Sequence, residues 1–94
     1  MKRMPPVELL ERTHRFPGPY MFKVIGRVED GFLARVVAAV RDELGQTADP
    51  PFRFRHTPGG RHVSITLEPV VQGGRQVLAI YSRLQQTRGL VLCL

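Results

Sequence analysis

Apolar side chains recur at every fourth position in the middle of the chain's first half. One helical face carries Phe32, Val36, Val40 and Leu44, with Leu33, Val37 and Ala39 beside them. Glu29 and Asp30 precede this run, where acidic side chains favour a helix N-terminus, and Gly45 follows it, where glycine commonly ends a helix. The pattern therefore predicts an amphipathic helix over residues 32–44.

Three other segments carry the pattern of β-strands. Residues 20–25 are rich in aromatic and β-branched side chains, and we expect Gly26 to end this strand. Residues 52–56 alternate between an aromatic ring and a basic side chain. Residues 61–67 alternate between polar and apolar side chains. The turn sequence Thr-Pro-Gly-Gly separates these two runs, which together predict a β-hairpin.

The last third of the chain adds a second helix and a final strand. A second helical face carries Val77, Ile80, Tyr81 and Leu84, and the apolar run 90–94 is short enough to be a strand. The order strand–helix–strand–strand–helix–strand is that of a ferredoxin-like α+β sandwich, a four-stranded antiparallel sheet with two helices on one face. We assign residues 15–94 to this domain and residues 1–14 to a polar leader segment, which contains a helix-compatible stretch at 7–13.

The alternation within each strand predicts which side chains face the helices. The apolar set is expected on the helix side: Tyr20, Phe22, Val24, Phe52, Phe54, Val63, Ile65 and Leu67. The opposite, open face then carries Met21, Lys23, Ile25, Arg53, Arg55, His62, Ser64 and Thr66. A shift of one residue would exchange the two sets, so the assignment depends on the apolar side being buried.

Composition narrows the class of protein. Ninety-four residues make one domain, and 43% apolar residues are ordinary for a folded chain. The lone cysteine, Cys93, excludes an internal disulfide and is expected to be buried or in an edge strand, in a reducing compartment. Because no segment reaches about 18 consecutive apolar residues and the N-terminus is too charged for a signal peptide, we expect a cytoplasmic protein with no membrane partner.

The net charge of +6 is unevenly distributed. Residues 1–50 carry eight basic and seven acidic side chains, whereas residues 51–94 carry six arginines and only Glu68. Arginine forms paired hydrogen bonds with carboxylates and phosphates, so the second half of the chain could attract an anion. A genome rich in arginine codons would produce the same bias.

Catalytic and metal-binding patterns are missing from the sequence. Neither serine lies in a nucleophile turn, and the two Gly-Gly pairs lack the flanking residues of a phosphate-binding loop. His56 and His62 flank the hairpin turn, but exposed histidines are common there and no further ligand is near. We therefore expect no enzyme, no metal site and no cofactor.

The remaining candidate site is the basic part of the open face, which we expect to contain Lys23, Arg53, Arg55 and His62, with no acidic residue among them. It could bind an acidic protein, a small anionic ligand or a second copy of the chain, or it could simply be solvated. Nucleic acid is the alternative, because the same element order occurs in RNA-recognition domains. That alternative is weaker, since the third strand offers no Phe or Tyr on the open face for base stacking.

Several of these residues resemble the signature of the YbeD-like family of small bacterial proteins of unknown function. The likeness lies in Phe16-Pro17, Tyr20, Phe22-Lys23-Val24, Gly26, the strand Val63–Thr66, and Val77, Tyr81 and Leu84. The resemblance implies a ferredoxin-like fold related to ACT-type regulatory domains, an association with lipoate metabolism, and no catalytic residues. The segment 68–74 is slightly longer here than the family pattern.

Overall fold

The sheet has four strands that are all antiparallel to their neighbours. The computed structural model describes residues 6–29 and 31–94. The strands are β2 (Phe22–Arg27), β3 (Phe52–His56), β4 (His62–Leu67) and β6 (Leu90–Cys93), in the spatial order β3-β4-β2-β6. This order and direction confirm the predicted ferredoxin-like sheet, with β3 and β6 at its edges.

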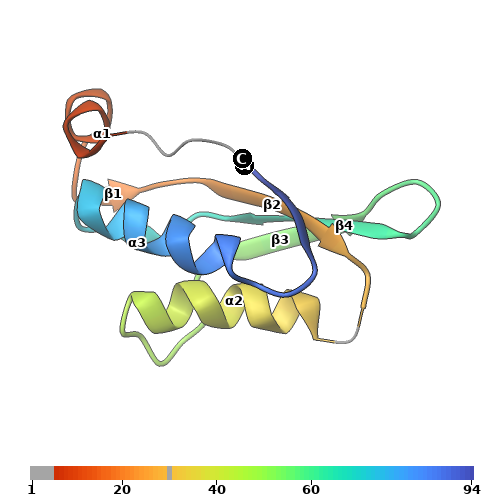
Figure 1. The fold of residues 1–94 in the computed structure, drawn as a ribbon. Coiled ribbons are helices and arrows are strands. Elements are labelled where there is room, and N and C mark those ends of the chain that lie inside the picture. Colours follow the sequence, from red (N-terminus) through yellow and green to blue (C-terminus); the bar gives the residue numbers. More distant parts are fainter. Residues whose placement is uncertain (1–5, 30) are drawn as a thin grey trace.

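Two helices, α2 (Phe32–Glu43) and α3 (Gly74–Gln85), cover one face of the sheet (Figure 1). Their predicted apolar faces are the ones that pack, since Val36 and Val40 of α2 and Ile80 of α3 are completely buried. Strands β2 and β4 supply the opposing layer with Phe22, Val24, Ile65 and Leu67. Burial of such side chains stabilises the fold by roughly 1.5–3 kcal/mol each, so this single layer is the main source of stability.

Strand β2 begins and ends two residues later than the pattern predicted. Gly26 lies inside the strand, opposite Val63 of β4, and the prediction that it ends the strand is wrong. The reason is a close approach: a Cβ atom at this position would collide with the ring of Phe32 at the start of α2. Glycine is therefore needed here because the first turn of α2 rests directly on the backbone of β2.

The segment before the sheet is helical and attached to the domain. Helix α1 (Val7–Thr13) packs against α3, and Leu10 is only 2% exposed. Gly74, the first residue of α3, makes the crossing close, since a Cβ there would lie 3.3 Å from the Val7 carbonyl oxygen. No helix within residues 6–29 and 31–94 has the length and apolar character to cross a membrane.

A second, small sheet was not predicted. Strand β1 (Gly18–Pro19) pairs with β5 (Val70–Val71), which follows the buried Pro69. Tyr20, which follows β1, packs against Phe22 and Tyr81, and the two tyrosine hydroxyl oxygens lie 3.3 Å apart. The pKa of the Tyr81 hydroxyl is raised above its ordinary value, mainly because the group is partly buried and, to a smaller extent, because of its hydrogen bond with the Tyr20 hydroxyl.

In edge strand β3, the phenylalanine side chains point to the predicted face of the sheet but are less buried than predicted. Phe52 and Phe54 pair with Leu67 and Ile65 of β4, so they lie on the helix side as expected. They are nevertheless 40% and 50% exposed, whereas the alternation had predicted a half-buried strand with both rings in the core. The two helices cover the middle of the sheet and leave this edge uncovered.

Candidate functional site

Two rows of side chains cross the open face of the sheet. In one row, Lys23 of β2, Thr66 of β4 and Arg53 of β3 are direct neighbours across the strands. In the next row, Ile25, Ser64 and Arg55 occupy the equivalent places. Paired residues of an antiparallel sheet point to the same face, so the register brings Lys23, Arg53 and Arg55 together as predicted by the parity of the strands.

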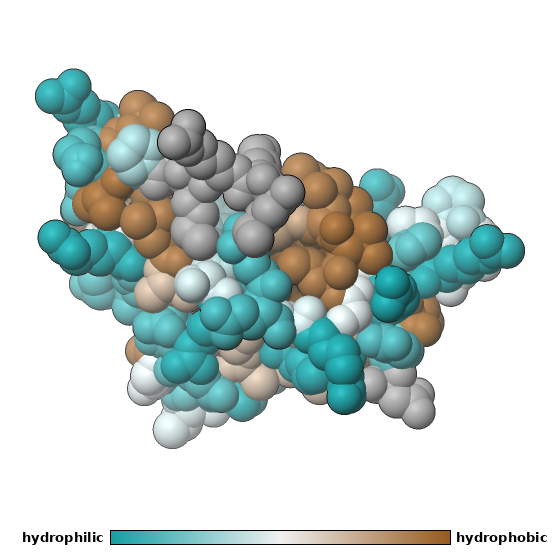
Figure 2. Space-filling view, in the orientation of Figure 1, coloured by the Kyte–Doolittle hydropathy of each residue, from teal (hydrophilic) through white to brown (hydrophobic). Residues whose placement is uncertain are grey.

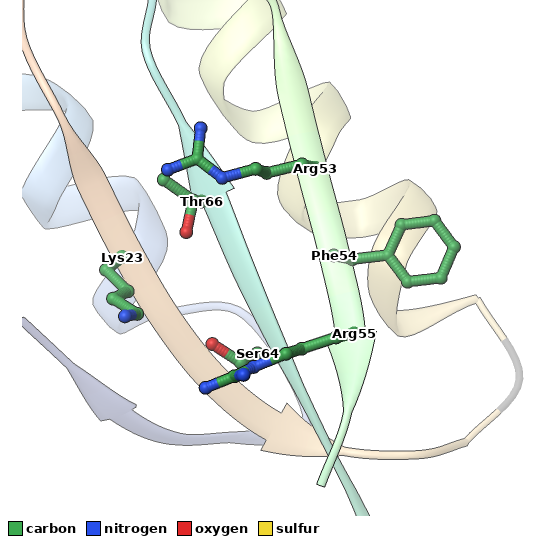
Figure 3. A pocket seen from close by; sticks show the side chains of 6 residues that line it. All are labelled: Lys23, Arg53, Phe54, Arg55, Ser64 and Thr66. Atoms are coloured by element: carbon green, nitrogen blue, oxygen red, sulfur yellow. The ribbon is translucent and has the colours of Figure 1, made fainter.

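These side chains enclose a shallow hollow of about 230 Å³, lined by Lys23, Arg53, Phe54, Arg55, Ser64 and Thr66. Figure 3 shows both arginine side chains extending from β3 across β4, towards the strand that carries Lys23, while Phe54 points the other way. Ser64 and Thr66 lie beneath them and are only 8% exposed. Guanidinium, ammonium and hydroxyl groups can all donate hydrogen bonds, so the hollow suits an oxyanion such as a carboxylate or a phosphate.

One acidic residue borders this group, contrary to the prediction that none would. Arg53 donates a hydrogen bond of 3.0 Å to Glu68, which follows the end of β4 on the same face. Both side chains are well exposed, at 68% and 40%, and such surface ion pairs contribute at most about 1 kcal/mol. An incoming anion can therefore displace Glu68 from Arg53 at little cost.

The other two cations keep their charge unbalanced. Within the described residues, neither Lys23 nor Arg55 forms an ion pair. Lys23 lies on the open face, as predicted, but it is half-buried rather than fully exposed. The hollow therefore has an excess of positive charge even with Glu68 beside Arg53.

His62 lies apart from this group. It occupies the first position of β4, on the same face as Ser64 but opposite Arg27 of β2. It is not among the residues that line the hollow. The structure thus brings together three of the four predicted site residues and leaves His62 outside.

The sequence analysis placed Ile25 on the open face but missed the apolar residues that β6 and Leu94 add beside it. A second hollow of about 560 Å³ shares Lys23, Arg55 and Ser64 with the first and adds Ile25 and the terminal Leu94. Leu92 of β6 pairs with Ile25, and Figure 2 shows apolar side chains gathered over β6. The run Leu-Val-Leu-Cys-Leu contains no polar residue that could have indicated which of its members face outward.

The possible metal ligands and the single thiol were located as well. Across residues 6–29 and 31–94, no three His, Cys, Asp or Glu side chains are close enough to hold a metal ion. Cys93 is half-buried in edge strand β6, where it pairs with Val24 and packs against the core. We take the open face as the candidate functional surface because of the three cations that gather around its hollow.

Comparison with known proteins supports both the fold and the family. The family described as "Protein of unknown function (DUF493)" matches residues 11–94. A search of curated proteins finds no match. The solution structure of protein HP0495 from H. pylori is similar over 99% of this chain and 98% of that one, with a TM-score of 0.63 and 15% sequence identity. DUF493 is the YbeD-like family, so the resemblance seen in the sequence is confirmed. The chain therefore belongs to the DUF493 family.

Proposed function

We propose that this protein is a non-enzymatic interaction or regulatory domain that binds an anionic group of a partner on the open face of its sheet. One observation carries the proposal: Lys23, Arg53 and Arg55 surround two nearly buried hydroxyl groups on a face that neither helix covers. Three cations in one hollow repel one another, and a bound anion would relieve that repulsion.

The neighbouring apolar surface supports a partner larger than a simple ion. Ile25, Leu92 and Leu94 continue the basic hollow towards β6, and the last two are exposed. A partner with an anionic group next to an apolar one could contact both parts at once. A regulatory role like that of ACT-type domains and an association with lipoate metabolism are both predictions that rest on the family resemblance alone.

Nucleic acid is less well supported than a protein or a small anion. Among the described strands, no Phe or Tyr lies on the open face, because Phe22, Phe52 and Phe54 all point to the helix side. Stacking on aromatic rings is the usual way in which such a face holds single-stranded bases. Three cations give only a short phosphate track, so we treat nucleic acid as an outcome of the test.

The test is the double variant Arg53→Glu, Arg55→Glu. Both side chains are exposed, so the variant should unfold at nearly the same temperature as the parent. Binding of inorganic phosphate and of a glutamate-rich peptide, measured by calorimetry at low salt, should weaken at least about tenfold, since two charge-assisted contacts are lost.

A matched control separates the site from the net charge. Arg61→Glu, Arg75→Glu makes the same change in charge at two exposed positions, in the hairpin turn and on α3. Equal losses in both double variants would mean that only the overall charge matters, and the proposal would be wrong. Retained binding in the Arg53, Arg55 variant would also refute it. Strong salt-dependent binding of a single-stranded oligonucleotide, with none of the peptide, would instead favour nucleic acid.

A further inference from the structure

The backbone of β3 has an unused edge. Two hydrogen bonds fix the pattern of its pairing with β4: the Thr57 amide donates to the His62 carbonyl, and the Glu68 amide donates to the Pro51 carbonyl. Hydrogen-bonded pairs alternate along an antiparallel ladder, so Arg53 and Arg55 also bond to β4. The amide and carbonyl groups of Phe52, Phe54 and His56 therefore point outward, where no strand of the described chain lies.

The two faces beside this edge differ in chemistry. On the helix side, Phe54 and His56 border a groove of about 400 Å³, whose other walls include Val28, Phe32 and Leu33. On the open side, the same strand carries the exposed side chains of Arg53 and Arg55, which extend over β4 in the structure and can turn towards an added strand because they are held only at the surface. A strand added next to β3 would place alternate side chains over the apolar groove and over the arginines.

We propose that β3 accepts an extended segment of a partner protein as a fifth strand, and that this segment alternates apolar and acidic residues. The apolar side chains would lie in the groove beside Phe54, and the acidic ones would attract Arg53 and Arg55, whose side chains would turn from β4 towards the added strand. This inference rests on the proposed anion-binding role of the open face and specifies the partner's conformation and pattern. Such strand addition is a common mode of peptide recognition, with the backbone supplying affinity and the side chains specificity.

A second copy of this chain does not fit the edge. Two β3 strands paired with each other would set arginines against arginines, and like charges directly opposite one another are destabilising. None of the six described strands carries an acidic residue, so no strand of a second copy offers the complementary pattern. We therefore assign the partner segment to another protein.

The experiment uses a fluorescent peptide of eight residues that alternates Val and Glu, with two N-methylated forms of it. One form is methylated on its valines and the other on its glutamates. The two methylated peptides have the same side chains and the same charge, but each lacks the backbone amide protons along a different edge of the extended peptide. Antiparallel addition needs the valine amides and parallel addition needs the glutamate amides, so one methylated form should bind about tenfold or more weaker than the other. Equal affinity of the two forms would overturn strand addition.

Hydrogen exchange supplies an independent readout on the protein itself. Peptide binding should slow exchange of the amide protons of Phe52, Phe54 and His56 at least about tenfold, because these protons would enter a new ladder. His56→Pro should weaken peptide binding but keep phosphate binding, since it removes one outward amide and leaves Arg53 and Arg55 in place. A peptide with four valines followed by four glutamates should bind more weakly.

The outcomes separate this inference from the proposed function. If phosphate and all peptides bind through Arg53 and Arg55 but the outward amides stay unprotected, the face binds anions without adding a strand, and only this inference fails. If the Arg53→Glu, Arg55→Glu variant binds all probes as the parent does, the proposed function fails as well. If the protein binds phosphate but none of the peptides, the strand-addition inference is refuted alone.

Discussion

The contact between Gly26 and Phe32 determines how closely α2 approaches the sheet. Gly26 is buried near the end of β2, and Phe32, which is 1% exposed, lies over it at the first turn of α2. An added methyl group would collide with several atoms of the Phe32 ring. Because the ring is almost completely buried, we expect that it can make room for a methyl group only if the first turn of the helix moves away from the strand.

We expect Gly26→Ala to lower the free energy of unfolding by about 1–3 kcal/mol, the usual cost of overpacking a dense core. Phe32→Ala should cost about 3–5 kcal/mol, because it removes a completely buried ring. In the double variant the new methyl group finds space where the ring had been. Gly26→Ala should then cost almost nothing in the Phe32→Ala background, and the two changes should be less destabilising together than their sum by about 1–3 kcal/mol.

The assay is urea denaturation of the four proteins, followed by far-ultraviolet circular dichroism. Gly26→Ala combined with Leu10→Ala serves as the control, since Leu10 lies on α1 and does not touch Gly26. That pair should be additive within about 0.5 kcal/mol. Additive effects of Gly26→Ala and Phe32→Ala would show that the glycine is not required by the ring, and the account of the α2 packing would be wrong.

Three further predictions concern stability. Val36→Asp should lower the free energy of unfolding by about 3–5 kcal/mol in a denaturant titration, since it buries an unpaired carboxylate, and an unchanged midpoint would contradict the placement of α2 on the core. Leu10→Ala should lower the free energy of unfolding by about 2–5 kcal/mol, whereas Leu9→Ala should lower it by less than about 0.5 kcal/mol, because Leu9 is 49% exposed. Equal effects of the two changes in thermal melts would show that α1 is not part of the folded unit. The raised pKa of Tyr81 means that the unfolded chain loses its proton first, so stability should fall as pH rises above 10.0, and unfolding titrations of Tyr81→Phe should show a shallower fall.

The sequence pattern correctly predicted the elements that have one buried face and one exposed face along their whole length. The repeat of Phe32, Val36 and Val40 describes a helix with one buried face, and α2 has this face. The alternation in residues 62–67 likewise gave the correct face of β4, because that strand is central and is covered by helices on one side only. The same parity placed Lys23, Arg53 and Arg55 on one face before any register was known.

Features that depend on contacts between residues far apart in the sequence could not be predicted from local patterns. The alternation of residues 52–56 showed which way Phe52 and Phe54 point, but not that α2 leaves them uncovered. Pairing of β1 with β5 joins four residues that include Pro19 and have no strand pattern of their own. Glu68 is separated from Arg53 by 15 positions, and only the register of the hairpin brings the two together.

The two edges of the sheet are kept from unwanted pairing by different means, and this difference bears on where a partner can dock. At β6, the strand has four residues and its pairing with β2 shifts register between Ile25 and Gly26, so it offers a short and irregular edge to another strand. At β3, the ladder with β4 is regular over five residues, and the charges of Arg53 and Arg55 oppose pairing with a copy of itself. Charge excludes only strands of the same sign, whereas irregular geometry hinders every strand. Edge β3 can therefore stay free of self-association and still accept an acidic segment, which is the selectivity that a binding edge requires.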